Sequence, residues 1–537
     1  MKKIFVSMSL LLGLVLFAGC GNGGGGAADN GGAAAGGAGA GDTAVEGDGG
    51  QIVITAILAY PGAGLENDPS YHWPSFQRFE EETGIRIDWT IIRSGWADQR
   101  ALLLAAMDLP DTFWGNRTLQ MSDIQMNPEL FMRLNDFIDE STNINNMFNE
   151  EPELRRLVTF PDGSIYTLPH RMPLRPDTFC NTFINQVWLD NLGLPMPDCL
   201  DSFRNTLLAF RNDDPNQNEL QDEIPWSWPN QANPAFGAYW FFGTFGLTCN
   251  IFGERIMIRD GELVFINAED GWRDGVAFMA DLYADGLIDT EVFTHDWGMW
   301  FSKVQDPAVI VGVTTMWNQD AIFGPGHSYQ YVAMPPLRGV DGQRRWSSNP
   351  IDLRSSPNTW GMSSMASNPQ AAFDLIDFIY DPMNSVQLYF GSFNVGTELL
   401  PDGTINILPP VEPGMSQDEW LWTNSFGDMG PFYVSRAFEM LINPNPWVYT
   451  RLDNDAVYQP YLPDPANVFP TMIFTLEETA ELAILRTDIE NFVDMRFAAW
   501  VTGERNVHDD WMIIWHNWIQ WDFRVYWKFI EHDMKNL

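Results

Sequence analysis

Cations are scarce in this sequence, and lysine is the scarcest of them. Only five lysines occur in 537 residues: Lys2, Lys3, Lys303, Lys528 and Lys535. Against 30 Lys and Arg stand 71 Asp and Glu, which gives a formal net charge of −41. Binding of nucleic acid requires a basic surface, so this composition excludes it. Mutual repulsion at such a charge also opposes self-association, and we expect a monomer.

Common catalytic motifs and histidine- or cysteine-based metal motifs are lacking as well. Neither G-x-S-x-G nor H-E-x-x-H occurs, and the seven histidines show no metal-ligand spacing. Beyond Cys20, the cysteines are Cys180, Cys199 and Cys249, which form no zinc or redox motif and allow at most one disulfide. A glycoside hydrolase needs two opposed carboxylates, but among 71 acidic residues such a pair can always be found. Motifs alone therefore leave a secreted glycoside hydrolase and a surface scaffold or adhesin open as alternatives.

Apolar runs of membrane-spanning length are absent after the N-terminus. There, Lys2 and Lys3 precede the apolar residues 4–17, and Ala18 and Gly19 precede Cys20. This order predicts a secretory signal peptide over residues 1–19. The Ala-Gly-Cys ending resembles the lipobox of bacterial lipoproteins, with Phe17 in place of the usual leucine. The resemblance implies cleavage before Cys20 and a lipid, such as palmitate, on that cysteine; secretion without lipid is the alternative.

The segment after Cys20 supports an anchor. Residues 21–50 contain 14 glycines, and most of the rest are Ala, Asp or Asn. Such a composition forms no core and behaves as a flexible coil. We therefore expect residues 20–50 to be a tether that holds an extracytoplasmic protein on the cell membrane.

A segment of ten residues, DPNQNELQDE (214–223), has the pattern of a cation site. Oxygen-bearing side chains recur at Asp214, Asn216, Asn218 and Asp222, and Glu223 follows. Calcium takes six to eight oxygens from a tightly wound loop, which this spacing can supply. It is not a standard EF-hand, because the usual glycine and the usual last glutamate of that loop are both replaced. A surface turn, in which Asp and Asn bond their own backbone, is the alternative.

Apolar periodicity predicts an α/β chain that becomes rich in helices toward its C-terminus. Strands are expected over 51–60 and 85–92, with a short helix between them that ends at Gly84. Helices are further expected over 272–286, from Pro369 with Asn368 as cap, and from Thr475, whose spacing to Glu478 fits a capping box; a last helix is expected from Asp509 to the end. The length favours two or more domains.

Six segments carry a resemblance to a known family. They are DGSIYTLP (162–169), WLDNLGLPMP (188–197), DPNQNELQDEIP (214–225), DLYADGLIDTEVFT (281–294), NPQAAFDLIDFIY (368–380) and residues 469–504. In this order they resemble the family 1 extracellular solute-binding proteins of ABC importers, in the large oligosaccharide-binding branch similar to alginate-binding proteins. They are spread over most of residues 51–504.

The resemblance implies a two-lobed periplasmic-binding-protein-like fold of type II, with discontinuous α/β lobes joined by a hinge. The N-terminal lobe is expected over 51–165 plus about 335–405, and the C-terminal lobe over 166–334 plus about 406–537. It also implies a membrane-anchored substrate-binding protein that closes on an oligosaccharide between its lobes and delivers it to the transmembrane subunits of an ABC permease. The same resemblance leads us to expect that the protein is not an enzyme.

The resemblance gives the loop at 214–223 a role, because in alginate-binding relatives the corresponding loop holds calcium. The implied ligands of a structural Ca²⁺ are Asp214, Asn216, Asn218, the carbonyl of Leu220, Asp222 and Glu223. Both glycines of the family's loop are replaced here, by Gln217 and Glu219. If these positions require positive φ, each replacement costs about 1 kcal/mol or more.

Aromatic rings next to polar side chains are the expected ligand contacts, because sugars stack on aromatics and hydrogen-bond to amides and carboxylates. The candidate rings are Tyr60, Trp114, Trp297, Trp300, Trp317, Trp360 and Trp422. Their polar neighbours are Asn116, Asp296, Asn318, Gln319, Asn358 and Asn424. For each ring the alternative is a packing residue. His170, Arg171 and Arg175 could bind a uronate carboxylate, but ion pairing within this acidic protein is the favoured interpretation.

Overall fold

The computed structural model describes residues 51–60, 73–178, 180–229, 237–248, 255–324, 326–347, 354–464, 467–469 and 473–512. The expected signal peptide, the tether with Cys20, and Cys249 lie outside these ranges. Within them, Cys180 and Cys199 are free thiols. No helix in this part of the chain is long and apolar enough to cross a bilayer.

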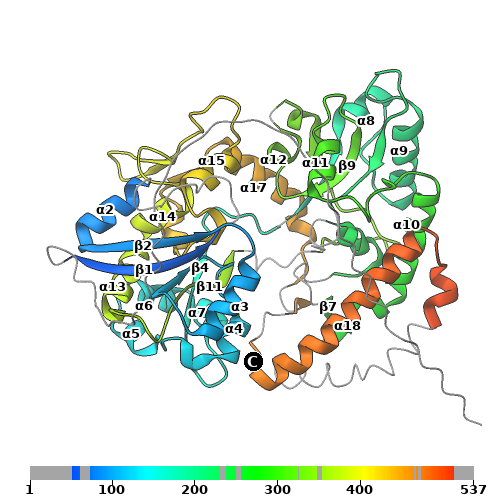
Figure 1. Ribbon diagram of the computed structural model, residues 1–537. Coiled ribbons are helices and arrows are strands. Elements are labelled where there is room, and N and C mark those ends of the chain that lie inside the picture. The colour runs from blue at the N-terminus through cyan, green and yellow to red at the C-terminus, as the bar shows by residue number, and fades with distance from the viewer. Residues whose placement is uncertain are drawn as a thin grey trace, which may run out of the picture. The chain divides into compact units, whose positions relative to one another are not determined.

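The first sheet combines strands from distant parts of the sequence. Its order is β2-β1-β3-β11-β4 (Figure 1). The strands are β1 (Ile52–Ala59), β2 (Ile85–Ile92), β3 (Thr112–Trp114), β4 (Thr167–Arg171) and β11 (Ser355–Met362). β1 is parallel to both of its neighbours, whereas β11 is antiparallel to β3 and β4. The later part of the chain therefore returns to complete a sheet that begins near the N-terminus.

Both faces of this sheet are buried. Successive strand residues point to opposite faces, and in β3 Trp114 packs with Leu58 in the larger cluster, whereas Phe113 packs with Leu119 and Ile124 in a smaller one. The helices of this part are α2 (Pro74–Thr83), α3 (Trp96–Ala106), α4 (Met121–Met126), α5 (Asn135–Glu140), α6 (Asn143–Glu150), α7 (Pro152–Val158), α13 (Pro369–Ile379) and α14 (Pro382–Phe390). We call the larger cluster core 1; it extends in sequence from Ile54 to Val448.

The second sheet has the order β10-β5-β9-β6. Its strands are β5 (Asn181–Asn185), β6 (Ile224–Trp226), β9 (Val311–Met316) and β10 (Tyr331–Ala333). The helices around it are α8 (Gln186–Leu192), α9 (Leu200–Asn212), α10 (Asp270–Ala284), α11 (Trp297–Val304) and α12 (Gln319–Phe323), and a hairpin of β7 (Ile256–Arg259) and β8 (Glu262–Phe265) is added. Its larger cluster, core 2, is rich in tryptophan, and a smaller one on the other face includes Phe183 and Trp300.

The rest of the described chain is mostly helical. A small sheet, β12-β13-β14, has strands β12 (Thr397–Leu399), β13 (Ile405–Ile407) and β14 (Ile442–Asn443). The late helices are α15 (Gln417–Asn424), α16 (Arg436–Glu439), α17 (Pro446–Tyr458) and α18 (Leu476–Val501). Short 3-10 segments are η1 (Pro128–Leu130), η2 (Ala238–Phe245), η3 (Ile266–Ala268), η4 (Ser328–Gln330), η5 (Gly427–Met429) and η6 (Gln459–Tyr461).

Helix α17 belongs to both cores. Its first turns place Trp447 and Val448 in core 1, and its last residue, Tyr458, lies in core 2. The Tyr458 hydroxyl accepts from the backbone N–H of Thr182 (3.0 Å) and donates toward the Met334 carbonyl (2.9 Å). The fold is thus two-lobed, one lobe around each core, as the sequence predicted. Buried residues between 406 and 448 pack in core 1, in a stretch that the expected division gave to the C-terminal lobe.

Local capping signals are confirmed. Gly84 ends α2 in the left-handed region, with φ 69°. The Asn368 side chain accepts from the N–H of Ala371 at the start of α13, and Thr475 and Glu478 form both bonds of the capping box of α18. Residues 507–512 are helical, and the remainder of the expected last helix lies outside the described residues.

Candidate functional site

Four of the predicted site residues meet where β1 and β3 end. Tyr60 follows β1 and Asn116 follows β3; because these strands are parallel, their carboxyl ends share one edge of the sheet, the usual ligand position in α/β folds. The Tyr60 hydroxyl donates to the carbonyl of Trp422, and the two ring centroids lie 5.6 Å apart. Asn358 Nδ2 donates to the carbonyl of Asn116 (3.1 Å). We call Tyr60, Asn116, Asn358 and Trp422 the strand-end cluster.

Beside this cluster lies an ion pair of Arg175 with Asp428, a partner that the sequence did not identify. Asn116 Nδ2 donates to the carbonyl of Asp428 (3.1 Å), and Arg175 Nη1 is 3.0 Å from Asp428 Oδ2. Loss of hydration opposes ionisation of Asp428, but Arg175 and Arg451 outweigh it, so the pKa of this carboxyl lies below its usual range. Burial raises the pKa of Tyr60, which therefore remains a hydrogen-bond donor. The edge thus offers amides and a charged pair, whereas the Tyr60 phenol is buried in core 1 with its hydroxyl bonded to the Trp422 carbonyl.

The basic residues after the DGSIYTLP segment are engaged within the protein. Arg171 Nε is 3.1 Å from Glu151, and its Nη1 is 3.2 Å from Glu439. His170 Nδ1 donates to the Gly430 carbonyl (2.9 Å), and burial lowers its pKa to about 4, so the ring is neutral at pH 7. With Arg175 paired to Asp428, the interpretation of these arginines as ion-pair partners is confirmed.

Four of the predicted rings are packed inside the lobes, and Tyr60 of the strand-end cluster is one of them, 0% exposed in core 1. Trp114 and Trp360 face each other across the β3–β11 pairing and are 2% and 1% exposed. Trp114 Nε1 donates to Thr112 Oγ1 (3.0 Å). Trp300 is fully buried with Phe183 against the second sheet. In this conformation these rings support the sheets, and their contact with a ligand stays a prediction.

The second lobe contributes the remaining rings. Trp297 begins α11, which Asp296 caps by accepting from the N–H of Met299 (2.8 Å). Trp317 follows β9, and Asn318 next to it caps α12 by accepting from the N–H of Asp320 (2.7 Å). Both tryptophans are half-buried.

Two predicted amides have partners nearby. Gln319 accepts from Asn454 of α17, the helix that both cores share. Asn424 donates to the carbonyl of Trp420 (3.0 Å) within α15. The predicted residues therefore form two groups, one in each lobe. Asp428 was missed, and the signal that could have identified it is its position in a glycine-containing turn six residues after Trp422.

The loop at 214–223 is wound around its own side chains. Asp214 accepts from the N–H groups of Asn218 (3.0 Å) and Glu219 (3.1 Å), and Asn218 Oδ1 accepts from the N–H of Leu220 (2.7 Å). Gln217 and Glu219 have φ of 60° and 61°. Both positions where the family's loop has glycine thus require the left-handed conformation, and a non-glycine residue is strained there.

The loop contains the carboxylate, amide and carbonyl oxygens that a hard cation such as Ca²⁺ takes as ligands. Glu223 Oε1 is buried without a hydrogen-bond partner, and burial, with Asp222 and Asp214 nearby, raises the pKa of this carboxyl. A cation among these carboxylates would relieve that repulsion. Within the described residues, however, no three His, Cys, Asp or Glu side chains are grouped as metal ligands. Asn216 and Asn218 direct their Nδ2 atoms to Asp222 (3.4 and 3.1 Å), so their amides would have to turn to present oxygen.

Comparison with known proteins finds similar sequences and similar structures. No family model matches the sequence. The chain is 29% identical over 460 residues, 81% of each chain, to the fructooligosaccharide ABC transporter substrate-binding protein FusA of Streptococcus pneumoniae serotype 4. It is 24% identical over 265 residues, 48% of each chain, to the lipoprotein LipO of Bacillus subtilis.

Solved structures agree with the sequence relatives. FusA in complex with kestose aligns with a TM-score of 0.79 and 26% identity over 90% of this chain and 100% of FusA, and an EF-hand mutant of FusA with fructo-nystose aligns equally. The alginate-binding protein AlgQ2 without calcium shares the fold, with a TM-score of 0.68 and 21% identity over 90% of this chain and 97% of AlgQ2. Sequence and fold together support a family 1 extracellular solute-binding protein similar to those of ABC importers that bind oligosaccharides.

Proposed function

We propose that this protein binds an oligosaccharide between its lobes and delivers it to an ABC permease, with fructooligosaccharides as the first class to test. The observation that carries the proposal is the alignment with FusA over 81% of both chains, since a FusA structure contains kestose. No catalytic role is proposed, because this relative is named a substrate-binding protein.

The ligand contacts are proposed from the two groups of side chains. Trp422 from one lobe and Trp297 and Trp317 from the other supply half-buried rings for sugar faces. Asn116 and Asn358 of the strand-end cluster supply amides as partners for sugar hydroxyls. Arginines already paired with carboxylates favour a neutral sugar over a uronate, because a uronate would have to displace Glu151, Glu439 or Asp428.

The lobe limits and the anchor are part of the proposal. Core membership supports an N-terminal lobe of 51–172 plus 354–448 and a C-terminal lobe of 181–347 plus 458–512. A lipid on Cys20 and the tether at 20–50 would hold both lobes outside the cell membrane, in keeping with the relative named a lipoprotein.

Titration with kestose and nystose tests the function. We expect saturable quenching or enhancement of tryptophan fluorescence, with a dissociation constant in the micromolar range or below. A dissociation constant of about 1 μM corresponds to a binding free energy of about −8 kcal/mol. Sugar recovered unchanged after prolonged incubation is the expected companion result. Cleavage of the sugar would support the glycoside hydrolase instead. No response to these or to a panel of plant and algal oligosaccharides would leave the scaffold interpretation.

We further propose a structural Ca²⁺ in the loop at 214–223, held by Asp214, Asn216, Asn218, the Leu220 carbonyl, Asp222 and Glu223. A ligand at a hundred times its dissociation constant stabilises the folded state by about 2.7 kcal/mol. A chelator should therefore lower the thermal midpoint by about 3 °C or more. Asp222→Asn should make the midpoint independent of chelator.

Asp402→Asn is the matched control for the calcium site. Asp402 also closes a turn by accepting from the N–H of Thr404 (3.0 Å), but it stands apart from the loop. This variant should keep the chelator response of the wild type. An unchanged wild-type midpoint, together with no calcium in elemental measurement of the purified protein, would refute the site.

A further inference from the structure

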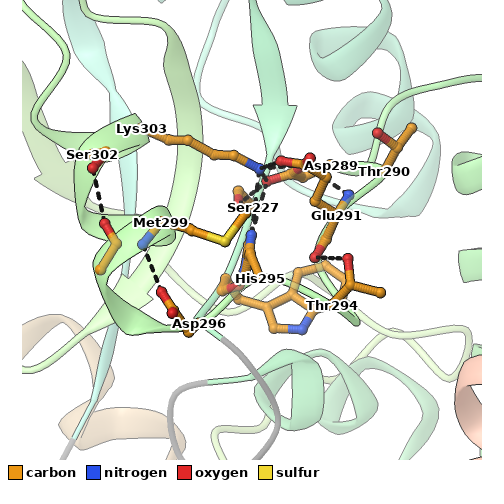
Figure 2. A network of polar contacts seen from close by, with 12 residues as sticks. Ser227, Asp289, Thr290, Glu291, Thr294, His295, Asp296, Met299, Ser302 and Lys303 are labelled. Atoms are coloured by element: carbon orange, nitrogen blue, oxygen red, sulfur yellow. Dashed lines mark hydrogen bonds and ion pairs between the residues drawn. The ribbon is translucent and has the colours of Figure 1, made fainter. Parts of the chain in front are cut away.

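Lys303 is the one lysine among the residues that the structure describes, and it lies in the last turn of α11 (Figure 2). Its side chain is 16% exposed and extends to Asp289, which is 4% exposed, and to the fully buried His295. In a protein whose formal net charge is −41, this cation is withdrawn from the surface. Its contacts therefore call for an explanation.

The ammonium is surrounded by three acceptor side chains. Lys303 Nζ is 2.7 Å and 2.9 Å from the two carboxylate oxygens of Asp289, 2.8 Å from Glu291 Oε2 and 3.3 Å from His295 Nδ1. An ammonium group has three N–H donors and no acceptor. Asp289, Glu291 and His295 thus use all three, in the manner of ligands around a small cation.

The tautomer of His295 fits this arrangement. His295 Nε2 is 2.8 Å from the carbonyl of Trp228, and a carbonyl only accepts, so Nε2 carries the proton. His295 Nδ1 then has a lone pair and accepts from Lys303. A neutral imidazole in this orientation completes the set of acceptors around the ammonium.

The acceptors belong to the framework of the second lobe. Asp289 accepts from Ser227 Oγ (2.8 Å) and from the N–H of Glu291 (3.0 Å), and its own N–H donates to the carbonyl of Trp226 in β6 (2.9 Å). Burial opposes ionisation of Asp289, but the bonds from Lys303, Glu291 and Ser227 outweigh it and lower its pKa. Lys303 thereby ties the end of α11 to the edge of β6.

The other end of α11 is fixed by the same group of residues. His295 immediately precedes Asp296, the cap of α11, and Trp297 is the first residue of the helix. The ring of Trp297 lies 5.8 Å from those of Trp300 and Phe301, centroid to centroid. Since the helix has only about two turns, a movement at Lys303 would move Trp297 with it.

We propose that Lys303 is a positioning residue for ligand binding, whose ammonium acts as an internal cation that fixes α11 and so orients Trp297. The proposal rests on the proposed function, because Trp297 matters only if a sugar is bound. A fixed position of the Trp297 ring increases the affinity for the sugar, because a loosely held ring spends less time in the binding geometry. Glu291, Asp289 and His295 act through Lys303 in the same way.

The test compares kestose affinity in variants of the purified protein. Lys303→Met removes the ammonium and keeps a chain of similar length; we expect at least about a tenfold weaker affinity. Arg259→Met is the matched control, because Arg259 is an exposed cation of the same lobe paired with Glu269. We expect this control to bind as the wild type does. Lys303→Arg, which keeps the charge, should fall between wild type and Lys303→Met.

Rescue of kestose affinity by an added ammonium ion distinguishes a positioning role of the Lys303 ammonium from a general effect of the substitution on the structure. In Lys303→Ala, n-propylammonium chloride should restore a large part of the affinity, whereas tetramethylammonium chloride, which has no N–H donor, should not. Lys303→Met with wild-type affinity would overturn the proposal, as would equal rescue by both salts. If Lys303→Met does not fold, a Lys303→Arg variant no better than Lys303→Ala would overturn it too. A wild type that binds no sugar would instead refute the proposed function.

Discussion

Replacement of Arg171 by methionine is expected to lower the free energy of unfolding by about 3–5 kcal/mol, because it leaves buried carboxylates without their cation. Arg171 is 2% exposed and lies between Glu151 (3.1 Å) and Glu439 (3.2 Å), and its Nη1 also donates to the Val434 carbonyl (2.8 Å). Urea denaturation of wild type and variant, followed by circular dichroism, measures the difference.

The loss should depend on pH in a defined direction. Burial raises the pKa of Glu151, and Arg171 opposes this effect. Without Arg171, the pKa of Glu151 in the folded variant would rise further above its value in the unfolded chain than it does in the wild type. Stability contributed by the protonated form is lost as pH rises, so the deficit of the variant should be larger at pH 8 than at pH 5.

Arg155→Met is the control for Arg171→Met. Arg155 is 40% exposed and pairs with Asp139 at 3.8 Å, and an exposed pair of this kind contributes less than about 1 kcal/mol. A variant at Arg171 that loses no more stability than this control would show that the buried pairs are not needed.

Local signals in the sequence predicted the elements of the fold well. Gly84 ends α2 and Thr475 begins α18 because each interaction closes within four residues, so the sequence contains all of its partners. The strand over 85–92 follows from alternation along one segment. The oxygen spacing at 214–223 likewise indicated a tightly wound loop. The family's two glycines marked the positions, now Gln217 and Glu219, where φ is positive.

What the sequence could not supply are contacts between distant segments. Trp114 and Trp360 look like loop-associated rings, but pairing of β3 with β11 places them opposite each other inside the sheet. The pair of Arg175 and Asp428 likewise joins residues that are 253 positions apart in the sequence. Residues up to Val448 pack in core 1 because the first turns of α17 belong to that core, while the end of the same helix belongs to core 2. No local pattern in the sequence shows this division of one helix between two cores.

The members of the strand-end cluster could be predicted from the sequence as candidate ligand contacts. Their meeting at one edge of the sheet could not. Tyr60 and Asn116 were identified as polar or aromatic residues that follow strands, and parallel pairing then brings them to one edge. Trp422 comes from α15, far along the chain, and its carbonyl accepts from the Tyr60 hydroxyl. This meeting makes Trp422 the ring of the first lobe on which sugar binding should depend most.

Trp422→Ala is accordingly expected to weaken kestose binding by about 2 kcal/mol, or roughly 30-fold, the usual size of a dominant aromatic contact. The ring is half-buried at the margin of core 1, so its removal should leave the fold intact. Trp422→Phe retains an aromatic face and should recover part of the affinity. Tyr449→Ala removes an aromatic ring that is 53% exposed on α17 and should bind as the wild type does. Isothermal titration of the four proteins decides the matter: equal affinity in Trp422→Ala and Tyr449→Ala would place the sugar away from the strand-end cluster.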